Sequence, residues 1–313
     1  MRASASRHLA PLMTGVLLAL LAGCGGSSDS GSDADSSLSP ASASSIAVVT
    51  STNVYGDIVE RIGGGREKVT SIIGNPDQDP HSHEADTRNQ LALSRAKVVV
   101  ENGGGYDDFI DRMLHSTDNS SAEVINAVEV SGKAAPAGGE LNEHVWYDFP
   151  TVGKVADRIA VALGKAAPDA AATFIQNAED FKAGLKPLEA KEAQIKADHG
   201  GAEVAITEPV PLYLIEASGL TNATPEEFSE AIEEGDDVSP RTLRDTLALF
   251  TGKKVEALVH NEQTSGPQTE KAERAAEGAG IPVVPVTETL PEGEDYLGWM
   301  TANVDALASA LDK

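Results

Sequence analysis

The 313-residue chain has one cysteine, few aromatic residues and far fewer basic than acidic side chains. A single cysteine excludes an intramolecular disulfide, so the fold must be stabilised by its core. With 24 Lys and Arg against 49 Asp and Glu, the formal net charge is −25, which argues against binding to nucleic acid or to an anionic membrane surface. Phe, Trp and Tyr make up only 4% of the residues, which argues against a cleft built for a large organic ligand.

The apolar run near the N-terminus, residues 12–21, is too short to span a bilayer comfortably. It ends in Leu21-Ala22-Gly23-Cys24, which resembles a bacterial lipoprotein processing site. This resemblance implies that residues 1–23 are a lipoprotein signal peptide and that lipid is attached to the thiol of Cys24. Residues 24–45 are rich in Ser, Gly and Asp, and we expect them to be a flexible tether.

Strand-like and helix-like segments alternate along the rest of the chain. Residues 47–49 form an apolar run, the spacing of apolar residues from 54 to 62 predicts a helix, and residues 69–73 form a second apolar run. Such a β-α-β unit predicts a parallel sheet. The same alternation resumes at residue 203, which indicates a second unit of the same kind.

A longer helical run, residues 168–198, separates the two halves. Gly184 and Pro187 lie inside it, so we expect a kink or a break there. A run of this length suits a connector better than a helix within one lobe. The sequence therefore predicts an α/β fold with two parallel-sheet lobes, residues 46–166 and 200–313, joined by a long rigid linking helix at residues 167–199.

Four side chains stand at positions suited to metal binding. His81 follows Asp79-Pro80, where proline stiffens the backbone, and His144 lies in a second polar segment of the same style. Glu208 and Glu288 each follow a strand-like run, and ligands of open parallel sheets bind beyond the carboxyl ends of the strands. We therefore expect one divalent metal ion in the cleft between the lobes. Two imidazoles and two carboxylates suit Mn²⁺, Fe²⁺ or Zn²⁺.

The order and spacing of these motifs resemble a known family, the zinc- and manganese-binding solute-binding lipoproteins of bacterial ABC importers (cluster A-I). The resemblance extends from Ile46 to the C-terminus and rests on the two C-terminal strand ends together with Asp79-Pro80-His81-x-x-Glu84, His144-Val145-Trp146, and Asn102-Gly103 before Tyr106-Asp107. It implies a monomeric binding protein without enzymatic activity. Such a protein is anchored to the cell membrane by lipid on Cys24, faces outside the cytoplasm, and delivers Mn²⁺ or Zn²⁺ to a permease with its ATPase.

By position, the resemblance makes His81 and His144 the two ligands of the first lobe. Glu208 occupies the third ligand position, where zinc-binding members generally carry His and manganese-binding members Glu. Glu288 occupies the fourth, where the family usually has Asp, one methylene shorter. The carboxylate in third position and the absence of a long His- and Asp-rich loop between His81 and His144 favour manganese.

Other polar residues are expected to have lesser roles. Glu84 is expected to orient His81 by hydrogen bonding, and His83, where the family commonly has an aromatic residue, to be exposed or to support a ligand indirectly. His260 follows a strand-like run and is the reserve ligand. The acidic segment at residues 225–237 predicts a solvated surface rather than a metal site.

Two other classes of function use comparable residues. A metallohydrolase needs an open coordination position and a nearby base, but the sequence has no His-Glu-x-x-His motif and no nucleophile elbow. A siderophore-, haem- or cobalamin-binding protein of similar architecture fits poorly with the low aromatic content and with a cleft that contains His rather than Arg. Metal binding is therefore the main prediction.

Overall fold

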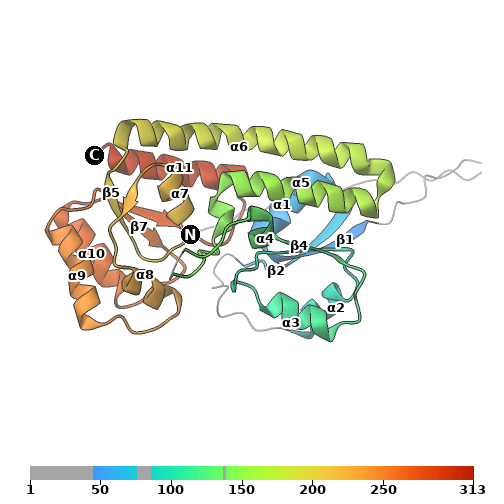
Figure 1. Ribbon diagram of the computed structural model, residues 1–313, viewed down its shortest axis with the longest axis horizontal. Helices are drawn as coiled ribbons and strands as arrows, with labels where there is room; N and C mark the ends of the chain where they lie inside the picture. The colour runs from blue at the N-terminus through green and yellow to red at the C-terminus, as the bar shows by residue number, and fades with distance from the viewer. Residues whose placement is uncertain (1–44, 76–85, 137–138) are drawn as a thin grey trace, which may run out of the picture. The chain divides into compact units, whose positions relative to one another are not determined.

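The computed structural model of the protein describes residues 45–75, 86–136 and 139–313. They form two parallel four-stranded sheets with flanking helices, and both sheets belong to one compact unit (Figure 1). The predicted α/β fold with two parallel-sheet lobes is therefore confirmed. Several predictions lie outside the described residues: the signal peptide at residues 1–23, the tether up to residue 44 with its lipid site at Cys24, and the roles of His81, His83 and Glu84.

The first sheet contains β1 (Ile46–Thr52), β2 (Glu67–Ile73), β3 (Val98–Glu101) and β4 (Glu123–Asn126), in the order β2-β1-β3-β4. Val48 of the central strand β1 pairs with Val69 on one side and Val98 on the other, and every pair of strands is parallel. Strands in parallel sheets are buried by helices on both faces, which explains their continuous apolar runs. The helices of this half are α1 (Asn53–Gly63), α2 (Thr87–Leu93), α3 (Phe109–Ser116), α4 (Ala127–Ser131) and α5 (Phe149–Ala166).

The first helix, α1, follows directly from β1 and has the predicted apolar face. Val54, Ile58 and Ile62 are all buried against the core. The helix ends at Gly63 and is capped by Gly64, whose φ of 59° is left-handed. Glycine commonly ends helices in this conformation because it has no Cβ to clash. The β-α-β unit expected from the sequence is thus confirmed.

The second sheet contains β5 (Glu203–Ile206), β6 (Thr221–Asn222), β7 (Leu258–Asn261) and β8 (Val283–Val286), in the order β6-β5-β7-β8. All of its pairs are parallel, so the carboxyl ends of β5, β7 and β8 lie at one edge. The helices of this half are α7 (Leu212–Ala217), α8 (Glu226–Glu233), α9 (Pro240–Thr251), α10 (Thr269–Ala279) and α11 (Tyr296–Leu311).

A 29-residue helix, α6 (Ala171–His199), connects the two halves. It packs on α1 and α5 from the first half and on α7 and α11 from the second (Figure 1). The helix continues through Gly184 and Pro187, so the predicted break does not occur. At Gly184 an added Cβ would lie only 2.5 Å from Leu297 of α11, which shows that glycine allows a close approach of the two helices instead of interrupting one of them.

The largest hydrophobic cluster includes residues from both sheets, such as Val48 and Val204. The two halves therefore share a core rather than meeting only at their surfaces. Across the described parts of the chain, no helix combines the length and the apolar character that crossing a membrane requires.

Candidate metal centre

His144 lies directly before a short 3-10 helix (η2, Val145–Tyr147) and is fully buried. Its Nδ1 lies 2.7 Å from Oδ1 of Asn142, and its backbone N–H donates to the same oxygen over 3.1 Å. Because a backbone N–H can only donate, that oxygen is an acceptor, and Nδ1 must carry the proton. In the neutral ring Nε2 then has the lone pair, so Nε2 is the ring atom able to coordinate a metal.

The loop that carries His144 is held from both halves of the chain. Asn102, at the end of the first sheet, donates from Nδ2 to the carbonyl oxygen of Glu143 over 2.9 Å. Tyr213 on α7 donates from its hydroxyl to the carbonyl oxygen of Asn142 over 2.6 Å. These two hydrogen bonds flank His144 and fix the backbone that presents its ring.

The Asn-Gly and Tyr-Asp motif of the first half builds the turn behind this loop. Asp107 accepts hydrogen bonds from the backbone N–H groups of Asn102 at 2.6 Å and Gly103 at 2.7 Å. Gly103 has a φ of 77°, a left-handed conformation that favours glycine. Burial raises the pKa of Asp107, and the hydrogen bonds that it accepts oppose this shift. The turn thereby aims the side chain of Asn102 at the His144 loop.

Glu208 and Glu288 each lie two residues beyond the ends of β5 and β8 and are buried. Between those strands runs β7, which ends at Asn261. The Asn261 amide donates to Oε2 of Glu208 over 2.5 Å and to Oε1 of Glu288 over 2.8 Å. Three neighbouring strands of one parallel sheet thus deliver two carboxylates and an amide to one edge, where ligand sites of such sheets form.

The imidazole and the carboxylates meet at Nε2 of His144. This atom lies 3.5 Å from Oε1 of Glu233 and 3.9 Å from Oε2 of Glu288. The ring of Tyr106 stands edge-on to His144, with 5.9 Å between ring centroids. Burial, and next the charge of Glu288, raise the pKa of Tyr106 well above its usual value, so its hydroxyl stays neutral beside the carboxylates.

The structure therefore brings together three of the predicted ligands: His144, Glu208 and Glu288. Their role in metal binding, and that of His81, stay predictions. His260 faces elsewhere, because neighbours along a strand point to opposite sides, and its Nε2 lies 3.6 Å from Oε1 of Glu273 on α10. Burial lowers the pKa of His260, while the charges of Glu273 and Glu262 oppose that shift.

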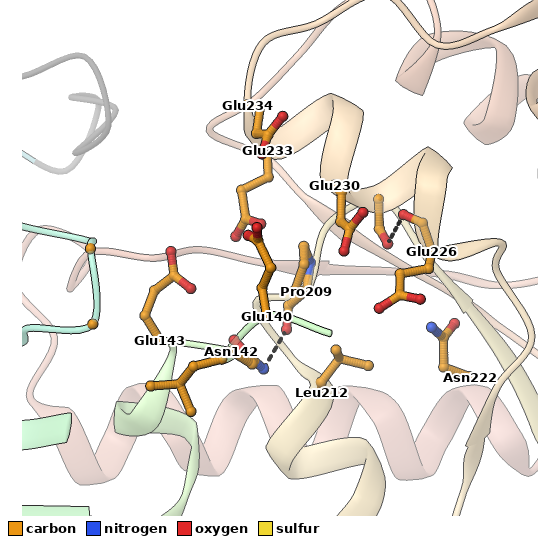
Figure 2. A pocket seen from close by; sticks show the side chains of 14 residues that line it. Glu140, Asn142, Glu143, Pro209, Leu212, Asn222, Glu226, Glu230, Glu233 and Glu234 are labelled. Carbon is orange, nitrogen blue, oxygen red and sulfur yellow. Dashed lines mark hydrogen bonds between the residues drawn. The ribbon is translucent and has the colours of Figure 1, made fainter. Parts of the chain in front are cut away.

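An acidic cavity of about 730 Å³ adjoins the His144 loop. Figure 2 shows carboxylates from the loop and from α8 turned toward the same space. Among the 14 described residues that line it there is no Lys and no Arg; six are glutamates, namely Glu140, Glu143, Glu226, Glu230, Glu233 and Glu234. Atoms suited to metal binding on Glu143, His144 and Glu233 all lie within 4.8 Å of one another.

Sequence reasoning missed two residues of this region. Asn261 ends the strand between those that precede Glu208 and Glu288, so strand order would have pointed to it. Glu233 belongs to the acidic segment predicted to be a solvated surface. Most acids of that segment are exposed as predicted, namely Glu226, Glu227, Glu234, Asp236 and Asp237, but the side chain of Glu233 is only 15% exposed. The available signal was helical spacing: Glu226, Glu230 and Glu233 recur at i, i+4 and i+7, which places them on one face of α8.

Comparison with known proteins identifies a family. The chain matches the model of ZnuA, described as zinc-uptake complex component A periplasmic, over residues 48–310. It is 33% identical over 186 residues to the manganese-binding lipoprotein MntA of Bacillus subtilis, covering 57% of this chain and 56% of that protein. Identity to the manganese-binding lipoprotein MntA of Halalkalibacterium halodurans is 31% over 178 residues, covering 56% of this chain and 55% of that protein. The chain thus spans about half the length of these curated relatives.

Solved structures share the fold at lower identity. The periplasmic zinc binding protein TroA from Treponema pallidum has a TM-score of 0.72 and 19% identity, covering 85% of this chain and 99% of that one. The binding protein FpvC from Pseudomonas aeruginosa, solved with Mn²⁺, has a TM-score of 0.71 and 22% identity, covering 85% of this chain and 98% of that one. The family match over residues 48–310 establishes that the chain belongs to the ZnuA family.

Proposed function

We propose that the protein captures one divalent transition metal ion, Mn²⁺ or Zn²⁺, outside the cytoplasm and delivers it to an ABC importer. This proposal rests on one buried cluster of side chains. Nε2 of His144 lies 3.9 Å from Oε2 of Glu288, and Asn261 donates hydrogen bonds to both Glu288 and Glu208. The bond to Asn142 leaves Nε2 of His144 as the atom facing these carboxylates. A neutral imidazole and ionised carboxylates are the forms that bind metal.

In this proposal His144, Glu208 and Glu288 are three of the ligands, and His81 is the fourth. Two carboxylates in the set favour harder ions than a site of imidazoles and thiolates does. The relatives in Bacillus subtilis and Halalkalibacterium halodurans are manganese-binding lipoproteins, whereas TroA is a zinc binding protein. We therefore propose manganese as the preferred ion, with zinc as its competitor.

The proposed partners follow from membership of the family. The ion is handed to a membrane permease driven by its ATPase, and the protein acts as a monomer without catalysing a reaction. Residues 1–23 are proposed to be a signal peptide, and residues 24–45 a tether to lipid on Cys24. The metal-binding lobes are proposed to be residues 46–166 and 200–313, with residues 167–199 as the linking helix. The protein is accordingly proposed to lie at the outer face of the cell membrane.

A competitive titration tests the proposal. Purified full-length protein, stripped of metal by a chelator, is titrated with Mn²⁺ and Zn²⁺ while bound metal is measured by elemental analysis. We expect one ion per chain, preferential retention of Mn²⁺ from a buffered mixture, and loss of tight binding in Glu208→Ala. The matched control is Glu256→Ala, which removes a carboxylate that lies just before β7, at its opposite end. If the wild-type protein binds no stoichiometric metal under any condition, the proposal is contradicted.

A further inference from the structure

The acidic cavity beside His144 contains one carboxylate placed differently from the others. Glu233 is the last residue of α8, and its Oε1 is shielded from solvent. Its side chain is 15% exposed, although the surrounding segment is strongly acidic. Taking an ionised carboxylate out of water is costly unless a cation or good hydrogen bonds compensate. Glu233 is therefore not part of a solvated acidic surface.

The distance between Glu233 and His144 fits a shared metal ion. An ion about 2.1 Å from each ligand atom holds neighbouring ligands roughly 3.0–3.5 Å apart, from octahedral to tetrahedral angles. The separation between Nε2 of His144 and Oε1 of Glu233 is 3.5 Å, and that between Nε2 and Oε2 of Glu288 is 3.9 Å. Glu233 is thus at least as well placed as Glu288 to share an ion with His144.

The charges around Glu233 in this cavity are mostly negative. Its described lining contains neither Lys nor Arg, and the carboxylate of Glu143 belongs to the same cluster. Mutual repulsion is also visible one turn away, where burial, followed by the charges of Glu226, Glu140 and other neighbours, raises the pKa of Glu230. A divalent cation at Nε2 of His144 would offset the charges of Glu233 and Glu288 together.

We propose that Glu233 is a direct ligand of the metal ion bound at His144, an additional carboxylate supplied by α8. This inference rests on the proposed function and deepens it, because it names a residue of the site that is absent from the four-ligand set. A third carboxylate makes the site richer in oxygen, which favours Mn²⁺ relative to Zn²⁺. Glu233 is in this sense a residue that determines metal specificity.

The alternative is a simple ion pair between Glu233 and a protonated His144, and the two make opposite predictions. If Glu233 is a ligand, Glu233→Gln should weaken Mn²⁺ binding. If Glu233 only pairs with the imidazolium, it competes with metal, and the same change should leave affinity unchanged or increase it. Gln keeps the size and polarity of the side chain, so packing in α8 is preserved.

The test compares Glu233→Gln with Glu230→Gln in the full-length protein. Glu230 lines the same cavity from the same face of α8, about 4.5 Å nearer the start of the helix. Both variants remove one negative charge, but only the first removes the proposed ligand. We expect Glu233→Gln to weaken Mn²⁺ binding by about 10- to 100-fold or more, and Glu230→Gln by less than about 5-fold. The ratio of Mn²⁺ to Zn²⁺ affinity should fall only in Glu233→Gln.

X-ray absorption spectroscopy of the Mn²⁺ complexes reports the atoms bound to the ion. Loss of a charge that is not a ligand would leave this measurement unchanged. Glu233→Gln should change the number or distances of the oxygen ligands, and Glu230→Gln should leave them as in the wild type. Equal effects of the two variants, or an unchanged metal environment in Glu233→Gln, would overturn the inference. Should Glu233→Gln fail to fold, Glu233→Asp replaces it, and an unweakened Mn²⁺ affinity there would also overturn it. A wild-type protein that binds no stoichiometric metal would instead contradict the proposed function itself.

Discussion

Oδ1 of Asn142 lies 2.7 Å from Nδ1 of His144 and also accepts the backbone N–H of that residue. This pair decides which ring nitrogen faces Glu233 and Glu288. Orientation by a hydrogen bond to the far nitrogen is common for metal-binding histidines and raises their basicity. The site is thereby organised before an ion arrives.

Replacement of Asn142 by Ala should weaken metal binding by about 10- to 100-fold, because the ring loses the partner that fixes its tautomer. Isothermal titration with Mn²⁺ measures the change. Asn142→Asp keeps an acceptor oxygen and should recover most of the affinity. Asn222→Ala, which alters the wall of the same cavity, is the control and should bind nearly as wild type. Equal affinities of Asn142→Ala and the wild type would show that the bond has no such role.

Asn261 should matter most when metal is absent. Its amide donates to both Glu208 and Glu288, and Asn261→Asp replaces these hydrogen bonds with a third carboxylate. We expect the metal-free protein to lose about 3–6 kcal/mol of unfolding free energy, since it loses two buried hydrogen bonds to charged groups and each is worth about 1.5–3 kcal/mol. Urea unfolding in chelator measures this loss, and added Mn²⁺ should recover part of it.

The matched control is Asn222→Asp. Asn222 accepts a hydrogen bond from the backbone of Thr224 through its Oδ1, and Asp can keep that bond while adding the same charge to the same sheet. The unfolding free energy of the metal-free Asn222→Asp protein should differ little from that of the wild type. A metal-free Asn261→Asp protein as stable as the wild type would mean that the amide does not hold the carboxylates together.

Because of Glu192 on α6, we expect the unfolding free energy of the protein to depend on pH. Burial, and next the charges of Asp148 and Glu189, raise the pKa of Glu192 to about 8. The folded state thus holds a proton that the unfolded chain releases near pH 4.5, so this group's contribution to stability is complete below that pH and is lost as pH rises toward 8. Glu192→Gln abolishes the titration and should gain about 3 kcal/mol relative to the wild type between pH 5 and pH 8.

Urea unfolding in chelator at the two pH values checks this, with metal removed so that the metal site does not contribute. Glu189→Gln is the control: Glu189 is exposed on the same helix, and its replacement should change the pH dependence far less. A constant difference between Glu192→Gln and the wild type across this range would refute the assignment.

A reciprocal clamp joins the start of α1 to the segment after Glu288. Asn53 donates from Nδ2 to the carbonyl oxygen of Leu290 over 2.8 Å and accepts the N–H of Leu290 over 3.0 Å. Asn53→Ala removes both bonds and leaves the backbone groups of Leu290 without this partner, which should cost about 1–3 kcal/mol. Thermal unfolding of the metal-free protein measures it; an unchanged midpoint would mean that water replaces the clamp at no cost.

Much of the fold could be predicted from local sequence patterns. Apolar runs and the helical spacing around Ile58 predicted a parallel β-α-β unit, and strand ends drew attention to Glu208 and Glu288, because parallel pairing brings the carboxyl ends of strands to one edge. The helix through Pro187 was less predictable. Whether proline and glycine interrupt a helix depends on what packs against it, and Leu297 belongs to a distant segment.

The position of Glu233 could not be obtained from such patterns. Helical spacing groups it with Glu226 and Glu230, but only the tertiary placement of α8 brings the Glu233 end of that face beside His144. A run of like charges is usually solvated, so composition pointed the other way. Asn261 lies between these cases, since strand order predicts its position but not its two hydrogen bonds.

The most direct measurement is anomalous X-ray scattering from crystals of the protein grown with Mn²⁺. We expect one strong peak within about 2.0–2.3 Å of Nε2 of His144 and of carboxylate oxygens from Glu208 and Glu288, lost in crystals of His144→Ala. A peak elsewhere, or none at full Mn²⁺ saturation, would show that these residues do not form a metal site.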